Sequence, residues 1–239
     1  MEENEVLRQL SERKSVRAFA PREIPEPAVR AILAAASNAP TAGNQQLYTI
    51  LRITDPALKT ALSESCDHQP FIAKAPLVLV FCADCKKWYD AYRSVGCDAR
   101  RPGVGDLLLA VDDALIAAQN AVTAAWSLGV GSCFIGDIME NMETQRSLLH
   151  LPEYVFPAAM LVFGYPMQQQ KDRKKPERTD LKYLVHENGY RKQDPREMFA
   201  YKSRDFDAWM RKFCSWKYQS DFSLEMSRSV RAFLDTLGK

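Results

Sequence analysis

The sequence lacks the short motifs that identify several common enzyme classes. It contains no G-x-S-x-G turn and no glycine-rich phosphate loop ending in G-K-[ST], so nothing indicates a serine hydrolase or a P-loop nucleotidase. Its 3 histidines, His68, His150 and His186, are scattered and have no metal-ligand spacing with cysteine or with each other. We therefore expect no metal centre, and we look for residues that bind an organic ligand.

The chain also lacks an excess of charge of one sign. Lys and Arg total 32 and Asp and Glu total 30, and this balance favours neither nucleic acid nor an anionic membrane as a partner. The N-terminal MEENEVLRQL has no apolar signal core, so we expect a cytoplasmic protein with its 6 cysteines reduced. The longest apolar stretch, 107–128, contains Asp112 and Asp113, which indicates a buried helix rather than a membrane span.

Hydrophobic periodicity predicts helices and strands mixed along one chain. A hydrophobic content of 46% is enough for a full core. The continuous apolar run at 77–82 is typical of a strand covered on both faces. This order of elements indicates an α/β or α+β sandwich, with a sheet between helical layers. We expect helices over 4–13, 28–37, 56–64 and 106–128, and strands over 47–53, 77–82, 132–135 and 158–163.

Two basic segments are candidates for binding a phosphate. Residues 13–17 (RKSVR) combine three cations with a hydroxyl, which suits a phosphate monoester. A basic helix end that interacts with the helix dipole explains the same residues without a ligand. Residues 171–178 (KDRKKPER) are a solvated loop by composition, unless they fold back toward 13–17.

Three further segments have both a functional and a structural interpretation. Residues 39–46 (APTAGNQQ) offer backbone amides and polar side chains to a ligand, or form an ordinary turn. In 129–137 (GVGSCFIGD) the glycines either allow a flat ligand to approach the backbone or cap a helix before a strand. The spacing of these glycines does not match a dinucleotide-binding fingerprint. Cys82 and Cys85 form a C-x-x-C pair, either a dithiol redox centre or two buried structural cysteines.

Taken in order, these features resemble the FMN-dependent nitroreductase family. The order is RKSVR, then APTxxNxQ, then a long helix with DDALIAAQN, then GVGSCFIG, and finally FGYP followed by the basic run. The resemblance extends from about residue 5 to about residue 184. It implies an α+β fold, a three-layer α-β-α sandwich whose central sheet is mixed and mainly antiparallel. It also implies an intertwined homodimer with FMN at the interface.

The resemblance further divides the chain and assigns its site residues. Residues 1–190 are expected to form the FMN-binding domain, and 191–239 a helical extension that packs on the partner subunit. In the family pattern Arg13 and Ser15 hold the phosphate and ribityl chain, Lys14 contributes mainly backbone, and Arg17 lies near the N1/O2 edge of the flavin. The remaining expected contacts are the partner-reaching loop with Pro40, Thr41, Ala42 and Asn44, the pyrimidine-edge Gln69, the ring-lining backbone of Phe134, Ile135 and Gly136, and the late basic pair Lys175 and Arg178.

The sequence departs from the family pattern in places. Ala42 stands where a second serine is frequent, and Leu47-Tyr48 replaces a frequent Pro-Trp. Glu177 separates the late basic pair more widely than usual.

The expected activity is electron transfer from NAD(P)H to a nitroaromatic or quinone. The expected cycle is ping-pong, with donor and acceptor using one pocket in turn and no side chain acting as acid or base. Three alternatives remain open. The first is a different flavin chemistry, either reductive dehalogenation or flavin breakdown, which would depend on lid residues at about 88–105. The second is a protein that binds FMN without catalysis. The third is a dithiol redox centre formed by Cys82 and Cys85.

Overall fold

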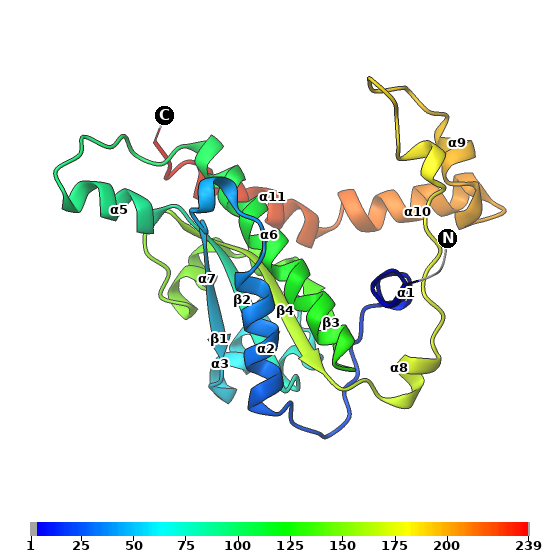
Figure 1. Cartoon of the computed structure of the whole chain (residues 1–239). Helices are drawn as coiled ribbons and strands as arrows, with labels where there is room; N and C mark the ends of the chain where they lie inside the picture. Colours follow the sequence, from blue (N-terminus) through cyan, green and yellow to red (C-terminus); the bar gives the residue numbers. More distant parts are fainter. Residues whose placement is uncertain (1–3, 239) are drawn as a thin grey trace. The chain divides into compact units, whose positions relative to one another are not determined.

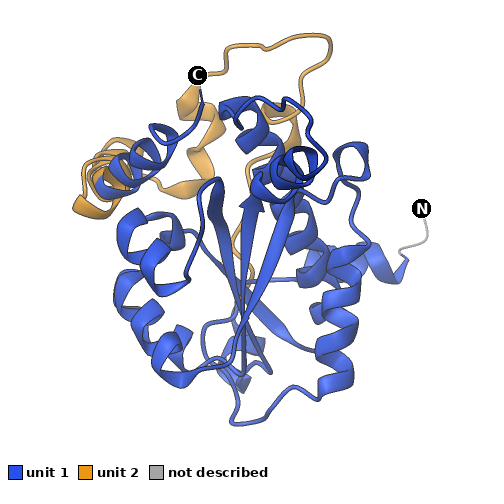
Figure 2. Cartoon of the chain, turned by 90° about the vertical axis from the view of Figure 1, so that its left-hand side faces the viewer, with its two compact units in different colours: residues 1–173, 225–239 blue, residues 174–224 orange. Residues whose placement is uncertain are grey.

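A computed structural model describes residues 4–238 of the chain. These residues form two compact units (Figure 2). The first unit contains the described residues up to Arg173 and those from Glu225 onward, and the second unit is Lys174–Leu224. The second unit therefore begins earlier than the expected extension at 191, and the end of the chain returns to the first unit.

A four-stranded sheet forms the centre of the first unit (Figure 1). Its strands are β1 (Tyr48–Ile53), β2 (Leu77–Asp84), β3 (Gly131–Ile135) and β4 (Val155–Gly164), in the order β1-β2-β4-β3. All three strand pairings are antiparallel. An isolated parallel bridge between Ser15 and Ser132 adds the N-terminal segment to the outer edge of β3. The sheet is thus antiparallel throughout its four strands, and parallel pairing is limited to that bridge.

Helices cover both faces of this sheet because β2 is apolar on both sides. Leu77, Leu79 and Phe81 belong to one buried cluster with α2 (Glu26–Ser37) and α6 (Val104–Ser127). The alternate residues Val78, Val80 and Cys82 belong to a second cluster. That second cluster includes residues of α3 (Pro56–Ser65), α4 (Pro70–Ala73) and α7 (Met142–Leu148).

The 24-residue helix α6 packs on the sheet through a face of small side chains. Ala110, Ala114 and Ala117 are fully buried and allow α6 to lie close to α2 and the strands. Gly129, at a φ of 72°, ends the helix as expected of a glycine beyond the C-cap. By length and hydropathy, α6 is the one helix within residues 4–238 that could cross a membrane, but its alanine face belongs to the protein core.

The remaining elements connect this framework and form the second unit. Helix α1 (Glu5–Glu12) is capped by Asn4 and buries none of its side chains. Helix α11 (Asp221–Leu234) begins in the second unit and ends in the first. In the first unit the ring of Phe233 packs against the ring of Phe156, with 4.9 Å between the ring centroids. The other elements are η1 (Ala42–Asn44), α5 (Lys86–Ser94), η2 (Asp137–Met139), α8 (Gln168–Asp172), η3 (Leu181–Tyr183), α9 (Pro195–Met198), η4 (Ala200–Lys202) and α10 (Phe206–Tyr218).

Candidate functional site

The basic N-terminal segment lies along the outer edge of β3. Ser15 bridges to Ser132, and the backbone N–H of Val16 donates to the Ser132 carbonyl at 2.9 Å. Gly131 permits this close approach, because a Cβ at that position would lie 2.5 Å from Cγ2 of Val16. The sheet edge therefore fixes the positions of Ser15 and Arg17.

Side chains of this segment influence the Cys133 thiol of β3. Burial raises the pKa of Cys133, while the Arg17 charge, the Ser15 hydroxyl and the Arg13 charge act in the opposite direction. Two cations and a hydroxyl thus gather at one strand edge. This arrangement suits an anionic group bound in front of β3.

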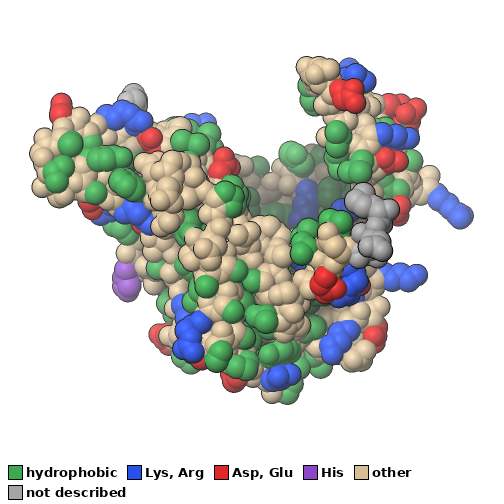
Figure 3. Space-filling model, in the orientation of Figure 1, with side chains coloured by type: hydrophobic (Ala, Val, Ile, Leu, Met, Phe, Trp, Pro, Cys, Tyr) green, Lys and Arg blue, Asp and Glu red, His purple; other side chains and the backbone are tan. Residues whose placement is uncertain are grey.

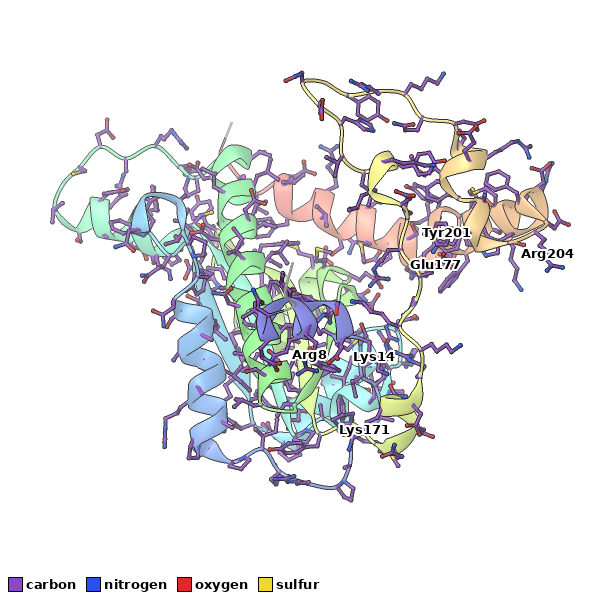
Figure 4. The ribbon with its side chains drawn as sticks, turned by 45° about the vertical axis from the view of Figure 1, so that its right-hand side comes forward. Arg8, Lys14, Lys171, Glu177, Tyr201 and Arg204 are labelled. Carbon is purple, nitrogen blue, oxygen red and sulfur yellow. The ribbon has the colours of Figure 1, made fainter. Side chains whose placement is uncertain are left out.

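The end of α8 folds back onto the same segment. Lys14 Nζ donates to the carbonyl of Lys171 at 2.6 Å and also to the carbonyl of Arg173 (Figure 4). In return, Arg173 Nη2 donates to the Ser15 carbonyl at 2.6 Å. The Lys14 ammonium therefore binds the protein's own backbone, and Arg173 becomes a further cation at the site.

Sequence patterns did not select Arg173. It lies within the basic run at 171–178, but only the contact with Lys14 and Ser15 distinguishes it from its neighbours. Lys175 and Arg178, the expected late basic pair, lie in the second unit. Their contribution to the phosphate remains a prediction.

The far end of β3 presents one exposed aromatic side chain beside polar groups. Phe134 is 37% exposed, Ile135 is buried, and a Cβ at Gly136 would meet nothing within 4 Å. Gln69, which precedes α4, reaches this end of the strand by donating to Oδ2 of Asp137 at 2.6 Å. The first unit thus brings Gln69 to the residues that follow β3.

A buried carboxyl lies close to this end of the site. Glu140 is 4% exposed, and among residues 4–238 its Oε1 has no hydrogen-bond partner. Burial, together with the carboxylates of Asp137, Asp67 and Glu225, raises the pKa of Glu140 to about 7. Sequence analysis missed this residue, because only folding brings the four carboxyl groups together.

The loop that follows α2 is held by a single carboxylate of α6. Asp113 is 3% exposed and accepts from the Thr41 hydroxyl, from the Ala42 N–H at 3.1 Å and from the Leu47 N–H at 3.0 Å. The Thr41 hydroxyl therefore holds the loop in place, whereas Pro40 and Asn44 are exposed. Asp113 fixes a loop whose exposed residues can contact a ligand or a second subunit.

The cysteines give little support to thiol or metal chemistry. All 6 are free thiols, and burial raises the pKa of both Cys82 and Cys85 to about 12. A thiol of that pKa is almost entirely protonated at neutral pH, which disfavours a dithiol exchange centre. Within residues 4–238, no three His, Cys, Asp or Glu side chains are grouped so that they could hold a metal ion.

Comparison with known proteins identifies the family of this chain. The sequence profile of the nitroreductase family matches residues 10–165. This chain belongs to the nitroreductase family. The matched region contains the basic segment, the loop held by Asp113 and all four strands, and it ends before Arg173 and the second unit.

Relatives of this nitroreductase-family chain include reductases of known type. The chain is similar to an oxygen-insensitive NADPH nitroreductase of Salmonella typhimurium, with 36% identity over 188 residues that cover 79% of this chain and 75% of the relative. It is also similar to an FMN reductase [NAD(P)H] of Bacillus subtilis, with 30% identity over 237 residues, covering 98% and 92%. The solved structure of NfrA2 from B. megaterium is similar over 98% of this chain and 97% of that chain, with 29% identity and a TM-score of 0.85.

Proposed function

We propose that this nitroreductase-family protein is an FMN-dependent oxidoreductase that passes electrons from NAD(P)H to an electron-poor acceptor. One observation carries the proposal. Ser15 and Arg17 are fixed along the outer edge of β3, the strand that contains the exposed Phe134 and leads to Asp137, to which Gln69 donates. A phosphate and a flat ring need this combination of cations, backbone and exposed apolar surface. The names of the relatives, an NADPH nitroreductase and an FMN reductase, point to the same chemistry.

We assign the residues at the sheet edge to the groups of FMN that their chemistry suits. Arg13, Ser15 and Arg173 would hold the phosphate end, because cations and a hydroxyl meet there. Arg17 would lie at the N1/O2 edge of the ring and stabilise negative charge there. The open space at Gly136 leaves room for the flat ring to approach the backbone.

Each of these residues binds or orients, and none needs to transfer a proton. Bound FMN supplies the redox chemistry, because its ring accepts a hydride and releases electrons to a second substrate. Asp137 holds the Gln69 side chain, so that this amide keeps one orientation toward the pyrimidine edge. Donor and acceptor would use the same exposed face in turn, which gives a ping-pong cycle.

The proposal includes an intertwined homodimer with a shared three-layer sandwich, located in the cytoplasm. Leu108, Leu115 and Ile116 of α6 and Leu7 and Leu10 of α1 are exposed in the single chain. Apolar side chains of this size on neighbouring turns favour a subunit interface. In such a dimer the exposed Pro40 and Asn44 would reach the partner's FMN, and the helical extension would pack on the partner.

An equilibrium titration with FMN tests the site directly. Replacing Arg17 by Gln removes the charge at the ring edge, and we expect FMN binding to weaken about 10- to 100-fold. The matched control is Arg52→Gln. Arg52 lies on β1, the opposite edge strand, where it pairs with Glu26 at 2.8 Å. Equal FMN affinity in wild type and Arg17→Gln would show that the flavin does not bind along β3.

A further inference from the structure

A large polar recess lies in the first unit, at the end of the sheet where β1 ends and β2 begins. Its volume of about 720 Å³ is within the range of small-molecule sites, roughly 300–1,000 Å³. This end of the sheet is the lower end of Figures 1 and 3, where several Lys and Arg side chains reach the surface. The lining side chains used below are Phe19, Arg22, Glu23, Arg52, Lys59 and Lys74.

The recess is separate from the proposed flavin site. Its walls come from the connection that leads to α2, the end of β1, α3 and the connection from α4 to β2. The flavin site lies along β3, and β1 and β3 are opposite edges of the sheet. Among the residues that the structure describes, none that we assign to FMN lines the recess. A ligand bound there would therefore be an additional one.

The charges around the recess indicate an anionic ligand. Within residues 4–238 one lining carboxylate, Glu23, faces four lining cations, Arg22, Arg52, Lys59 and Lys74. Arg52 is compensated from outside, because its guanidinium donates to both carboxylate oxygens of Glu26 at 2.9 and 2.8 Å. The other three cations have no carboxylate of the described residues within ion-pair distance. Three cations and one carboxylate give the lining an excess of two positive charges.

Lys59 is the most enclosed of these cations. Its ammonium donates to the Ala75 carbonyl at 3.0 Å and to the Pro76 carbonyl at 3.5 Å, which leaves one N–H for a ligand. Burial lowers the pKa of Lys59, the Glu23 charge opposes this shift, and the Arg52 charge adds to it. Two neutral carbonyls hold the ammonium without neutralising it, so a bound anion would stabilise its charge.

The segment that contains Arg22 is held in place by the protein itself. The backbone N–H of Ala20 donates to the Tyr165 carbonyl at 2.7 Å, and Phe19 bridges to Pro166. The Arg22 guanidinium lies over the Tyr165 ring, 4.0 Å from its centroid. With one face on the ring, the guanidinium keeps the donors along its edge for an anion.

We infer that this recess binds a small phosphorylated anion with two or more negative charges, held by Arg22, Lys59 and Lys74. Such an anion balances the excess charge of the lining, and guanidinium and ammonium groups are the usual donors to phosphoryl oxygens. The volume leaves room for a second phosphoryl group or a sugar. This site goes beyond the proposed function, since no step of the electron transfer requires it.

Isothermal titration calorimetry of the FMN-loaded protein with inorganic pyrophosphate, at fixed ionic strength, tests the inference. We expect saturable binding that weakens about tenfold in Lys74→Gln and in Arg22→Gln. The control Lys86→Gln removes the same charge on α5, where Lys86 pairs with Asp90 at 2.7 Å outside the recess, and should keep the affinity. Equal affinity in wild type and both recess variants, or no binding at about 5 mM pyrophosphate, would overturn the inference.

The Arg17→Gln variant separates this site from the flavin site. Pyrophosphate binding that weakens in Arg17→Gln but not in Lys74→Gln would place the anion along β3 and overturn the inference. If Arg17→Gln leaves FMN affinity unchanged, the proposed flavin site fails. The recess still stands in that case, provided that Lys74→Gln weakens pyrophosphate binding.

A titration with fructose 1,6-bisphosphate distinguishes the two sources of a phosphoryl group. Tighter binding than pyrophosphate would support the recess as a site for a phosphorylated sugar. Weaker binding would support it as a site for an inorganic phosphate. Binding of neither compound would overturn it.

Discussion

Two buried carboxyl groups of the first unit, those of Asp113 and Glu140, have contrasting surroundings. Asp113 is surrounded by three donors, two of them backbone N–H groups, so its charge is compensated. Glu140 has an oxygen without a partner among the described residues and has other carboxylates around it. The Asp113 carboxylate therefore stabilises the fold through its hydrogen bonds, whereas burial disfavours the ionised form of Glu140.

The pKa of Glu140 predicts a pH-dependent stability. The folded protein holds this proton up to a pKa of about 7, whereas the ordinary value is 4.5. Between these values the folded state binds more protons than the unfolded state, so the free energy of unfolding falls as pH rises. Glu140→Gln should therefore be more stable than wild type above pH 7, by about 1–3 kcal/mol, and the difference should vanish near pH 4.

Chemical denaturation across this pH range measures the effect. The control is Glu143→Gln, because Arg228 lowers the pKa of Glu143 to about 2 and the sign is reversed. That variant should show no gain in stability at high pH. A stability difference between Glu140→Gln and wild type that stays constant with pH would contradict the account of Glu140.

The contribution of Asp113 to stability can be compared with that of its exposed neighbour Asp112. Asp113→Asn replaces a carboxylate that accepts from three donors, and we expect a loss of about 2–4 kcal/mol in unfolding free energy. Asp112→Asn changes the neighbouring exposed carboxylate and should cost less than about 0.5 kcal/mol. Denaturant midpoints of the two variants check this prediction. Equal losses would mean that Asp113 does not anchor the loop.

At the scale of elements, local patterns located most of the sheet and the long helix. The expected strand at 77–82 is β2 at Leu77–Asp84, and the expected helix at 106–128 is α6 at Val104–Ser127. These elements were predictable because each is a long apolar run with clear ends. Helix α5 was missed, since only half-exposed rings mark one face of Lys86–Ser94.

The candidate site was predictable only in part, for a physical reason. The segment at 13–17 was visible as a basic cluster, but its position on β3 depends on a bridge to Ser132, about 115 residues away in sequence. Arg173 and Glu140 become notable only through tertiary contacts. The order of motifs indicated the family, and the geometry identified further residues at the site.

The close contact between the edge segment and β3 predicts a sensitive glycine. Gly131→Ala would place its Cβ 2.5 Å from Val16, so residues 15–17 must shift away from the strand. We expect a loss of about 1–3 kcal/mol in stability and weaker FMN binding. Gly105→Ala in α6, where a Cβ meets nothing within 4 Å, is the control and should retain both properties. Thermal unfolding and FMN titration of both variants would reveal the difference, and normal FMN affinity in Gly131→Ala would argue against the site.

At the scale of the whole molecule, the exposed apolar face of α6 predicts the assembly. Leu115→Arg places a charge within the proposed interface and should shift the protein from dimer to monomer in sedimentation velocity. The monomer should also lose FMN, because the loop with Pro40 and Asn44 would no longer reach the partner's site. Leu181→Arg changes an exposed leucine of the second unit and should leave the assembly unchanged. A Leu115→Arg dimer with full FMN content would contradict the shared site.

Anaerobic mixing of the FMN-loaded protein with NADPH, and separately with NADH, tests the central claim most directly. The account predicts that at least one donor removes the visible absorbance of the flavin, and that menadione added afterwards restores it. A flavin spectrum that stays unchanged with both donors, while FMN remains bound, would identify a flavin carrier and contradict the proposed reductase.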